Sequence, residues 1–132
     1  MKFQIEKADN KYVHAVGYFL EELEKEHKIT GFDDEQFVRY LFDPESLMLV
    51  ATTMEEKAIG FIHARNENNQ TIIHHLFVEH EHRQHEVEMY LVEMIERWAS
   101  SNHHKQIISP NNLDIFKQLG YQEKLGLLIK DL

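Results

Sequence analysis

Several residue types that carry chemistry or shape are scarce in this sequence. Its 132 residues include no cysteine, only two prolines and only five glycines. Without cysteine there is no disulfide scaffold, no thiolate zinc site and no cysteine nucleophile. No apolar run approaches the roughly 20 residues that a membrane-spanning helix needs, and the opening residues MKFQIE lack the apolar segment of a signal peptide. We therefore expect a soluble, cytoplasmic protein.

Positive charge is also in short supply. The chain has 14 Lys and Arg against 23 Asp and Glu, which gives a formal net charge of −9 at pH 7. Nucleic-acid binding requires clustered basic residues that neutralise phosphates, and anionic membrane surfaces attract polybasic patches. The acidic balance therefore predicts no nucleic-acid partner and no membrane partner. With 42% hydrophobic residues, a chain of this length can form one domain, residues 1–132, around its own core.

The hydrophobic pattern of the first half predicts a strand, two helices and three strands. Phe3 and Ile5 alternate with polar residues, as in a short strand. Apolar residues then recur at three- and four-residue spacing from Val13 to Leu23 and from Phe37 to Leu41, which is typical of amphipathic helices. Three apolar runs separated by polar turns follow, at Ser46–Thr52, Ala58–Ala64 and Thr71–Val78.

The second half predicts helices that alternate with strands. The strongest helical pattern is the wide apolar stripe from Val87 to Ala99. A short strand at Gln106–Ile108, a helix from Pro110 to Leu119 closed by Gly120, and a strand from Leu125 to Leu132 complete the chain. The predicted order is β-α-α-β-β-β-α-β-α-β. We expect an α/β (α+β) fold whose mixed, mostly antiparallel sheet has helices on both faces.

This order of elements resembles the GNAT superfamily of acetyl-CoA-dependent N-acetyltransferases over essentially the whole chain. The run LFVEHEHRQHEVEMYL, residues 76–91, is similar to the strand, loop and helix that hold the cofactor pyrophosphate in that family. The run FKQLGY, residues 116–121, is similar to the family's tyrosine-x-x-leucine-glycine-phenylalanine segment. The resemblance implies a single GNAT-like domain with acetyl-CoA as cosubstrate.

The resemblance also implies which residues bind the cofactor. In the family, the backbone of the strand before the loop hydrogen-bonds the pantetheine arm, and this segment maps to Leu76, Phe77 and Val78. The loop then presents backbone N–H groups at a helix N-terminus, where the helix dipole also favours an anion. The matching loop residues are Arg83, Gln84 and His85.

The loop departs from the family signature, Arg/Gln-x-x-Gly-x-Gly/Ala. Arg83 stands at the first position, but Glu86 and Glu88 stand at the two glycine positions. Their side chains crowd the path of the phosphates, and each like-charge pair costs roughly 3 kcal/mol at ~5 Å and an effective dielectric of ~20. Two interpretations stay open. Either the glutamates only satisfy the dipole of their own helix and no cofactor binds, or they turn outward and the backbone N–H groups still bind CoA.

The sequence assigns no catalytic residue. In many GNAT members a tyrosine of the last helix protonates the departing thiolate, but Phe116 stands there and has no hydroxyl, which predicts a core aromatic. Tyr90 and Tyr121 lie at other helical positions. For a general base the strand before the loop offers His74 and His75, which strict alternation puts on opposite faces. His74 is the candidate base, and the alternative is a half-exposed strand histidine.

Histidine is abundant, with ten in the chain, and three of these lie in the loop: His80, His82 and His85. Their spacing matches no familiar metal site, so we expect solvated side chains rather than a functional metal. A second hypothesis is a pH sensor, in which protonation of these rings cancels the negative charge of the loop. CoA affinity would then rise from pH 8 to pH 6.

Two functions are compatible with these residues. The first is acetyl transfer from acetyl-CoA to an unknown small-molecule or peptide amine, and the acidic surface favours a cationic acceptor such as a polyamine, an aminoglycoside or a lysine-bearing peptide. Glu86, Glu88 and Phe116 would leave this activity weak or lost. The alternative is a non-catalytic binding or regulatory module on a GNAT scaffold. A homodimer is compatible with either.

Overall fold

The structure, a computed structural model, describes residues 2–82, 86–111 and 114–132. Its strands form one sheet in the order β1-β2-β3-β4-β5-β7-β6. The strands are β1 (Phe3–Lys7), β2 (Ser46–Thr53), β3 (Ala58–Glu67), β4 (Gln70–Val78), β5 (Gln106–Ser109), β6 (Gln122–Lys124) and β7 (Leu127–Asp131). The helices are α1 (Val13–His27), α2 (Asp34–Phe42), α3 (Glu86–Ser101) and α4 (Asp114–Gln118), with short 3-10 turns η1 (Asn10–Tyr12) and η2 (His80–His82).

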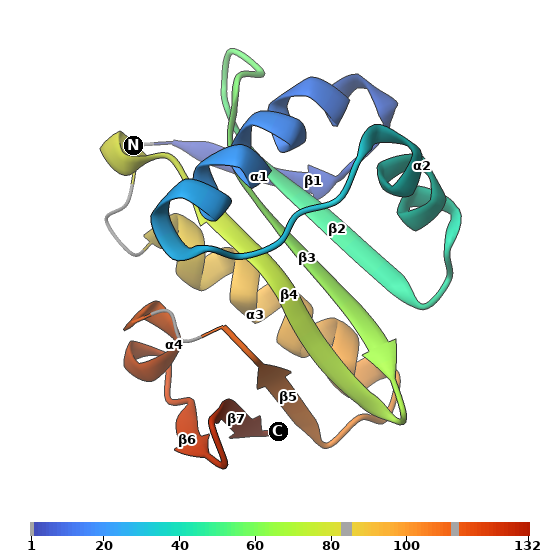
Figure 1. The fold of residues 1–132 in the computed structure, drawn as a ribbon, viewed down its shortest axis with the longest axis vertical. Helices are drawn as coiled ribbons and strands as arrows, with labels where there is room; N and C mark the ends of the chain where they lie inside the picture. The colour runs from blue at the N-terminus through green and yellow to red at the C-terminus, as the bar shows by residue number, and fades with distance from the viewer. Residues whose placement is uncertain (1, 83–85, 112–113) are drawn as a thin grey trace.

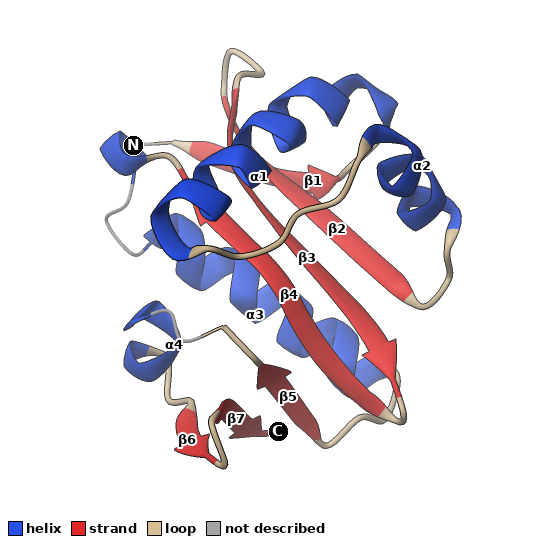
Figure 2. Ribbon diagram, viewed as in Figure 1, coloured by secondary structure: helices blue, strands red, loops and turns tan. Residues whose placement is uncertain are grey.

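The sheet is antiparallel except at one junction. β1 to β4 form an antiparallel meander, β4 and β5 run parallel, and β7 pairs antiparallel with both β5 and β6. Figures 1 and 2 show α1 and α2 on one face of the sheet and α3 on the other. The predicted fold class is therefore confirmed, including the mixed sheet and the helices on both faces. None of the described helices is both long and apolar enough to cross a membrane.

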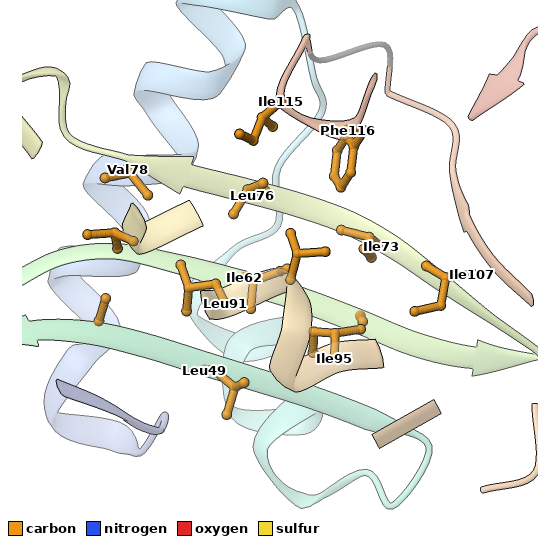
Figure 3. Close-up of a cluster of buried hydrophobic side chains, with 14 of the residues drawn as sticks. Leu49, Ile62, Ile73, Leu76, Val78, Leu91, Ile95, Ile107, Ile115 and Phe116 are labelled. Atoms are coloured by element: carbon orange, nitrogen blue, oxygen red, sulfur yellow. The ribbon is translucent and has the colours of Figure 1, made fainter. Parts of the chain in front are cut away.

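Each face of the sheet has its own apolar core, which explains the unbroken apolar runs of the central strands. On one face, Leu91 and Ile95 of α3 pack over buried residues of β2, β3 and β4 such as Ile62 (Figure 3). On the other face, the ring of Phe19 from α1 stacks on Phe77 with centroids 5.2 Å apart. The two faces of the sheet are thus covered by different helices.

The helix ends follow local chemistry. Asp33 accepts a hydrogen bond from the backbone N–H of Gln36 at 2.8 Å, and the Gln36 side chain accepts one from the Asp33 backbone N–H at 3.0 Å, so α2 begins with a complete capping box. The first helix is preceded by η1, which begins at Asn10. Asp9 caps that turn by accepting from Lys11 N–H at 3.0 Å.

The C-terminal elements differ most from expectation. The last helix is shorter than predicted, at Asp114–Gln118, and the last strand is a hairpin of β6 and β7. β6 has the sequence Gln-Glu-Lys and all three residues are exposed, so it has no hydrophobic alternation from which it could be predicted. Leu125 and Gly126 form its turn with φ of 53° and 81°.

Candidate functional site

The sheet opens between β4 and β5. These strands pair at only two positions, Thr71 with Ile107 and Ile72 with Ile108, although β4 continues to Val78. The chain after β5 leads away from β4 toward α4 (Figure 1). Where the two strands are still paired, the Thr71 hydroxyl lies 2.9 Å from His104 Nδ1, and this contact links the start of β4 to the segment before β5. One edge of β4 therefore loses its neighbouring strand along much of its length.

The backbone of Leu76 points toward this opening. The Asn111 side-chain amide donates to the His74 carbonyl at 2.8 Å from the β5 side, and the Glu79 N–H donates to Ile59 O at 2.8 Å on the β3 side. Successive residues of a strand present their N–H and C=O groups to alternate edges, so Leu76, three residues before Glu79 in unbroken register with β3, faces away from β3, on the edge where the His74 carbonyl lies. Since the side chains of Leu76, Phe77 and Val78 are 4%, 4% and 2% exposed, only their backbone can serve a ligand.

A β-bulge interrupts β4 beside the opening. His63 of β3 pairs with His75 and the next residue, Ala64, pairs with Ile73, so His74 is the extra residue. The His74 and His75 rings lie 6.3 Å apart by centroids, and both lie within 6 Å of the His63 ring. The prediction of opposite faces is therefore wrong, because a bulge cancels the strict alternation on which it rests.

A chain of hydrogen bonds runs beneath these rings. His75 Nε2 lies 2.9 Å from the Thr30 carbonyl, His75 Nδ1 lies 3.3 Å from His63 Nδ1, and His63 Nε2 lies 3.0 Å from the Ser46 hydroxyl. The carbonyl can only accept, so His75 carries its proton on Nε2 and accepts at Nδ1. His63 must then donate from Nδ1 and accept at Nε2, where Ser46 donates. One carbonyl thus fixes the tautomer of both rings.

Burial keeps both rings neutral. It lowers the pKa of His63 to about 2, with a further contribution from His75, and lowers the pKa of His75 to about 4 against a partly opposing hydrogen bond to Thr30. Phe32 packs its edge against both rings, with centroids 5.4 Å and 5.2 Å away, and Tyr40 packs on His63 at 4.5 Å. These two histidines therefore form part of the core beneath the α1–α2 connection.

His74 differs from its neighbours. Its Nε2 lies 2.6 Å from a carboxylate oxygen of Glu67 at the end of β3, and its side chain is 33% exposed. Because a carboxylate accepts, Nε2 carries the proton and Nδ1 carries a lone pair. Across the described part of the chain, Nδ1 has no hydrogen-bond partner. The site therefore contains a carboxylate–histidine pair of the type that orients a base.

The predicted cofactor loop is described only at its flanks, since Arg83, Gln84 and His85 lie outside the described residues. Glu86 opens α3 with an exposed side chain, whereas Glu88 is only 8% exposed and belongs to the buried face of that helix. The interpretation that both glutamates turn outward is therefore wrong for Glu88. Its position follows from the helical period, which puts it on the face of Val92 and Ile95.

A groove of about 270 Å³ lies between α1 and the segment that follows β4. Tyr18 and four carboxylates line it: Glu22, Glu26, Glu79 and Glu81. His80 Nε2 lies 2.6 Å from Glu26 Oε1 and so ties η2 to α1. Among the described residues, no group of three or more histidines and acids has the geometry of a metal site.

The aromatic residues considered for the acid role make other contacts in the structure. Phe116 is 1% exposed and belongs to the core (Figure 3), as predicted. Tyr121 donates to Glu96 at 3.0 Å and is 3% exposed, and burial raises its pKa. Tyr90 packs on Phe3 at the opposite edge of the sheet.

Four residues of the site were not singled out from the sequence: Ser46, His63, Glu67 and Asn111. His63 carries a signal, since it is the one polar side chain in the buried run Ile59–Ala64 of β3. Glu67 and Asn111 read as turn and loop residues. Their roles depend on the His74 bulge, which short-range patterns do not reveal.

Comparison with known proteins gives consistent results. A family model described as "Acetyltransferase (GNAT) domain" matches residues 17–128. Searches among curated proteins find no significant match. Three solved structures share the fold. A GNAT-family acetyltransferase from Staphylococcus aureus Mu50 has a TM-score of 0.81 and 14% identity, with 99% of each chain covered. The PaiA N-acetyltransferase from Thermoplasma acidophilum in complex with coenzyme A has a TM-score of 0.84 and 14% identity, with 100% of each chain covered. An N-acetylglutamate synthase from Neisseria gonorrhoeae complexed with coenzyme A and N-acetyl-glutamate has a TM-score of 0.84 and 13% identity, and the match covers 100% of this chain and 35% of that one. At these identities the likeness concerns the fold.

Proposed function

This chain belongs to the GNAT acetyltransferase domain family, and we propose that it transfers the acetyl group of acetyl-CoA to the nitrogen of a cationic amine. The observation that carries the proposal is the opened edge of β4, where the backbone of Leu76 points away from β3 toward the opening. An extended thioester arm laid along that edge would take the place of the missing strand. The Thermoplasma acidophilum protein, which shares the fold, has coenzyme A bound.

The proposed reaction is a direct acyl transfer. One ammonium group of the acceptor first loses a proton to solvent, and the lone pair of the resulting neutral amine attacks the thioester carbonyl carbon. A base removes a second proton from the nitrogen, the carbon–sulfur bond breaks, and the thiolate takes up a proton. The Leu76 N–H is the backbone donor available to the carbonyl oxygen as negative charge develops on it. The products are an acetamide and CoA thiol. No side-chain acid is assigned, because Phe116 and Tyr121 are buried in the core.

The acceptor is proposed to carry positive charge. The net charge of the chain is −9, and four carboxylates line the groove beside the end of β4. Such a surface raises the local concentration of cations and lowers that of anions. Polyamines, aminoglycosides and lysine-bearing peptides share this chemistry, and spermidine is a convenient first probe.

A second candidate function rests on the first turn of α3. Glu86 and Glu88 place two carboxylates where the family has glycines, and Glu88 occupies buried space there. If these groups exclude the pyrophosphate, the chain is a non-catalytic binding or regulatory module on the same scaffold.

Binding and turnover separate the two candidates. Calorimetry with acetyl-CoA tests binding, and a thiol-reactive dye tests CoA release with spermidine as acceptor. Because the chain contains no cysteine, every thiol detected comes from CoA. The acetyltransferase proposal predicts sub-millimolar affinity and spermidine-dependent thiol release. Absence of acetyl-CoA binding up to several millimolar, or binding without release of CoA thiol in the presence of spermidine or the other two amine classes, would favour the module.

A double variant tests the role of the glutamates. Glu86→Gly/Glu88→Gly removes two like charges and should tighten acetyl-CoA binding by about tenfold or more, since each pair costs up to ~3 kcal/mol before salt screening. Glu21→Gly/Glu24→Gly is the matched control, with the same change of charge at exposed positions of α1. Absence of binding to the wild type and to the folded double variant up to several millimolar at pH 7 would contradict the proposal.

A further inference from the structure

Three histidine rings gather at the bulge of β4, and their hydrogen bonds divide them into two kinds. His63 and His75 each use both ring nitrogens, toward Ser46, toward each other and toward the Thr30 carbonyl. They are 1% and 7% exposed. Neither ring can accept a proton from a bound molecule without breaking this chain of contacts. These two histidines are therefore structural.

His74 has the opposite properties. Its side chain is 33% exposed, its Nε2 faces Glu67 Oε2 at 2.6 Å, and its Nδ1 is without a hydrogen-bond partner in the described part of the chain. The carboxylate accepts a hydrogen bond from His74 Nε2–H and so holds the ring with the Nδ1 lone pair directed away from Glu67. A carboxylate in this position also stabilises the imidazolium that forms when Nδ1 takes a proton.

The position of His74 links this pair to the opened edge. Its backbone carbonyl faces the opening and accepts from the Asn111 side chain at 2.8 Å. It lies just beyond Ile72, the last β4 residue paired with β5, and two residues before Leu76. The bulge turns its side chain toward the α1–α2 face while its main chain stays at the edge.

We propose that His74 is the general base of acetyl transfer and that Glu67 is the residue that positions it. This inference rests on the proposed function. As the amine nitrogen bonds to the thioester carbon, its N–H proton passes to His74 Nδ1, and the imidazolium is stabilised by Glu67. When the carbon–sulfur bond breaks, the proton returns to the CoA sulfur or to water, which restores the neutral ring.

The experiment measures kcat and KM for acetyl-CoA with spermidine by thiol release. His74→Gln should lower kcat by about 100-fold and leave the KM for acetyl-CoA within about threefold, because the base acts only in the transition state. Glu67→Gln keeps an acceptor oxygen but removes the charge, and should lower kcat by about tenfold. Glu67→Asp should recover part of that loss. His14→Gln, at an exposed position of α1, is the matched control and should keep wild-type kcat.

A chemical rescue separates a base from a structural residue. His74→Gly leaves space at a partly exposed site, and added imidazole should restore at least tenfold of the lost kcat while having no effect on His14→Gly. Thermal unfolding of each variant shows whether it is folded. Wild-type kcat in folded His74→Gln, or absence of rescue in folded His74→Gly, would overturn the assignment of His74. Absence of acetyl transfer by the wild type would instead contradict the proposed function. Failure of the His74 assignment and failure of the proposed function can therefore be distinguished.

Discussion

The buried pair of histidines makes the stability of this protein depend on pH. The pKa of His63 is about 2 and that of His75 about 4 in the folded protein, against about 6.5 for an unfolded histidine. Between pH 6.5 and pH 4 the unfolded chain therefore binds up to two more protons than the folded chain. The free energy of unfolding then decreases as the pH falls, and this stabilisation is fully present only above pH 6.5.

The size of the effect follows from linkage. Each proton difference contributes ~1.4 kcal/mol per pH unit, so two histidines give a limiting slope of ~2.7 kcal/mol per unit. Lowering the pH from 7 to 5 should thus reduce the free energy of unfolding by about 4 kcal/mol through this pair alone. Domains of this size have a stability of roughly 5–15 kcal/mol. The predicted loss is therefore a large fraction of the total.

Urea unfolding at several pH values between 7 and 5 measures this slope. The reference is His63→Gln/His75→Gln, whose amides can still hydrogen-bond but do not titrate. For this variant the free energy of unfolding should change less steeply with pH, by an amount that corresponds to close to two protons. Because the other eight histidines and the acids are the same in both proteins, their contribution cancels in the comparison. Nitrogen NMR of the rings gives a direct check, because His75 should carry its proton on Nε2 and His63 on Nδ1. Equal slopes for the two proteins, or either ring titrating near pH 6.5 in the folded wild type, would refute the reasoning.

Two further predictions concern backbone positions. Gly60→Ala should lower the free energy of unfolding, measured with urea, by about 2 kcal/mol, because a Cβ atom at residue 60 would lie 2.6 Å from the Phe77 carbonyl oxygen. Gly17→Ala on helix α1 should raise the free energy of unfolding by about 1 kcal/mol, because its Cβ atom would meet no atom within 4 Å. Equal stability of the two variants would contradict the close approach of β3 to β4. Leu125→Asn should raise the melting temperature. Leu125 is fully exposed and has a φ of 53°, a conformation that costs leucine about 1 kcal/mol or more and that asparagine tolerates. An unchanged or lower melting temperature would count against strain at this turn.

The fold could be predicted because its signals are local and repeated. The wide apolar stripe from Val87 to Ala99 predicts α3, and the change to continuous apolar runs after Ser46 predicts strands buried on both faces. β6 could not be predicted, because its three exposed polar residues show no hydrophobic periodicity. The turn at Leu125 could not be predicted either, because leucine is not a residue that predicts positive φ.

The site was less accessible to sequence reasoning, because it depends on contacts between segments far apart in the chain. His74 could be proposed as a base from its strand alone. Its partner Glu67 could not, since that contact requires the hairpin of β3 and β4 to be aligned with a one-residue bulge. His63 and Ser46 are brought to His75 by register across three strands. The departures at Glu86, Glu88 and Phe116 were visible directly, because they are substitutions within a recognisable motif.

The bulge at His74 also determines how this strand can change in evolution. The single extra residue puts the two halves of β4 in opposite phase, so that Leu76 and Val78 reach the α3 core while Phe77 reaches the core of α1. Loss of one codon here would exchange these faces and rotate the backbone groups of Leu76 away from the opening. Point substitutions change one contact each, whereas a one-residue deletion would damage both cores and the site together. Lineages of this protein should therefore keep the length of β4 even where its residues diverge.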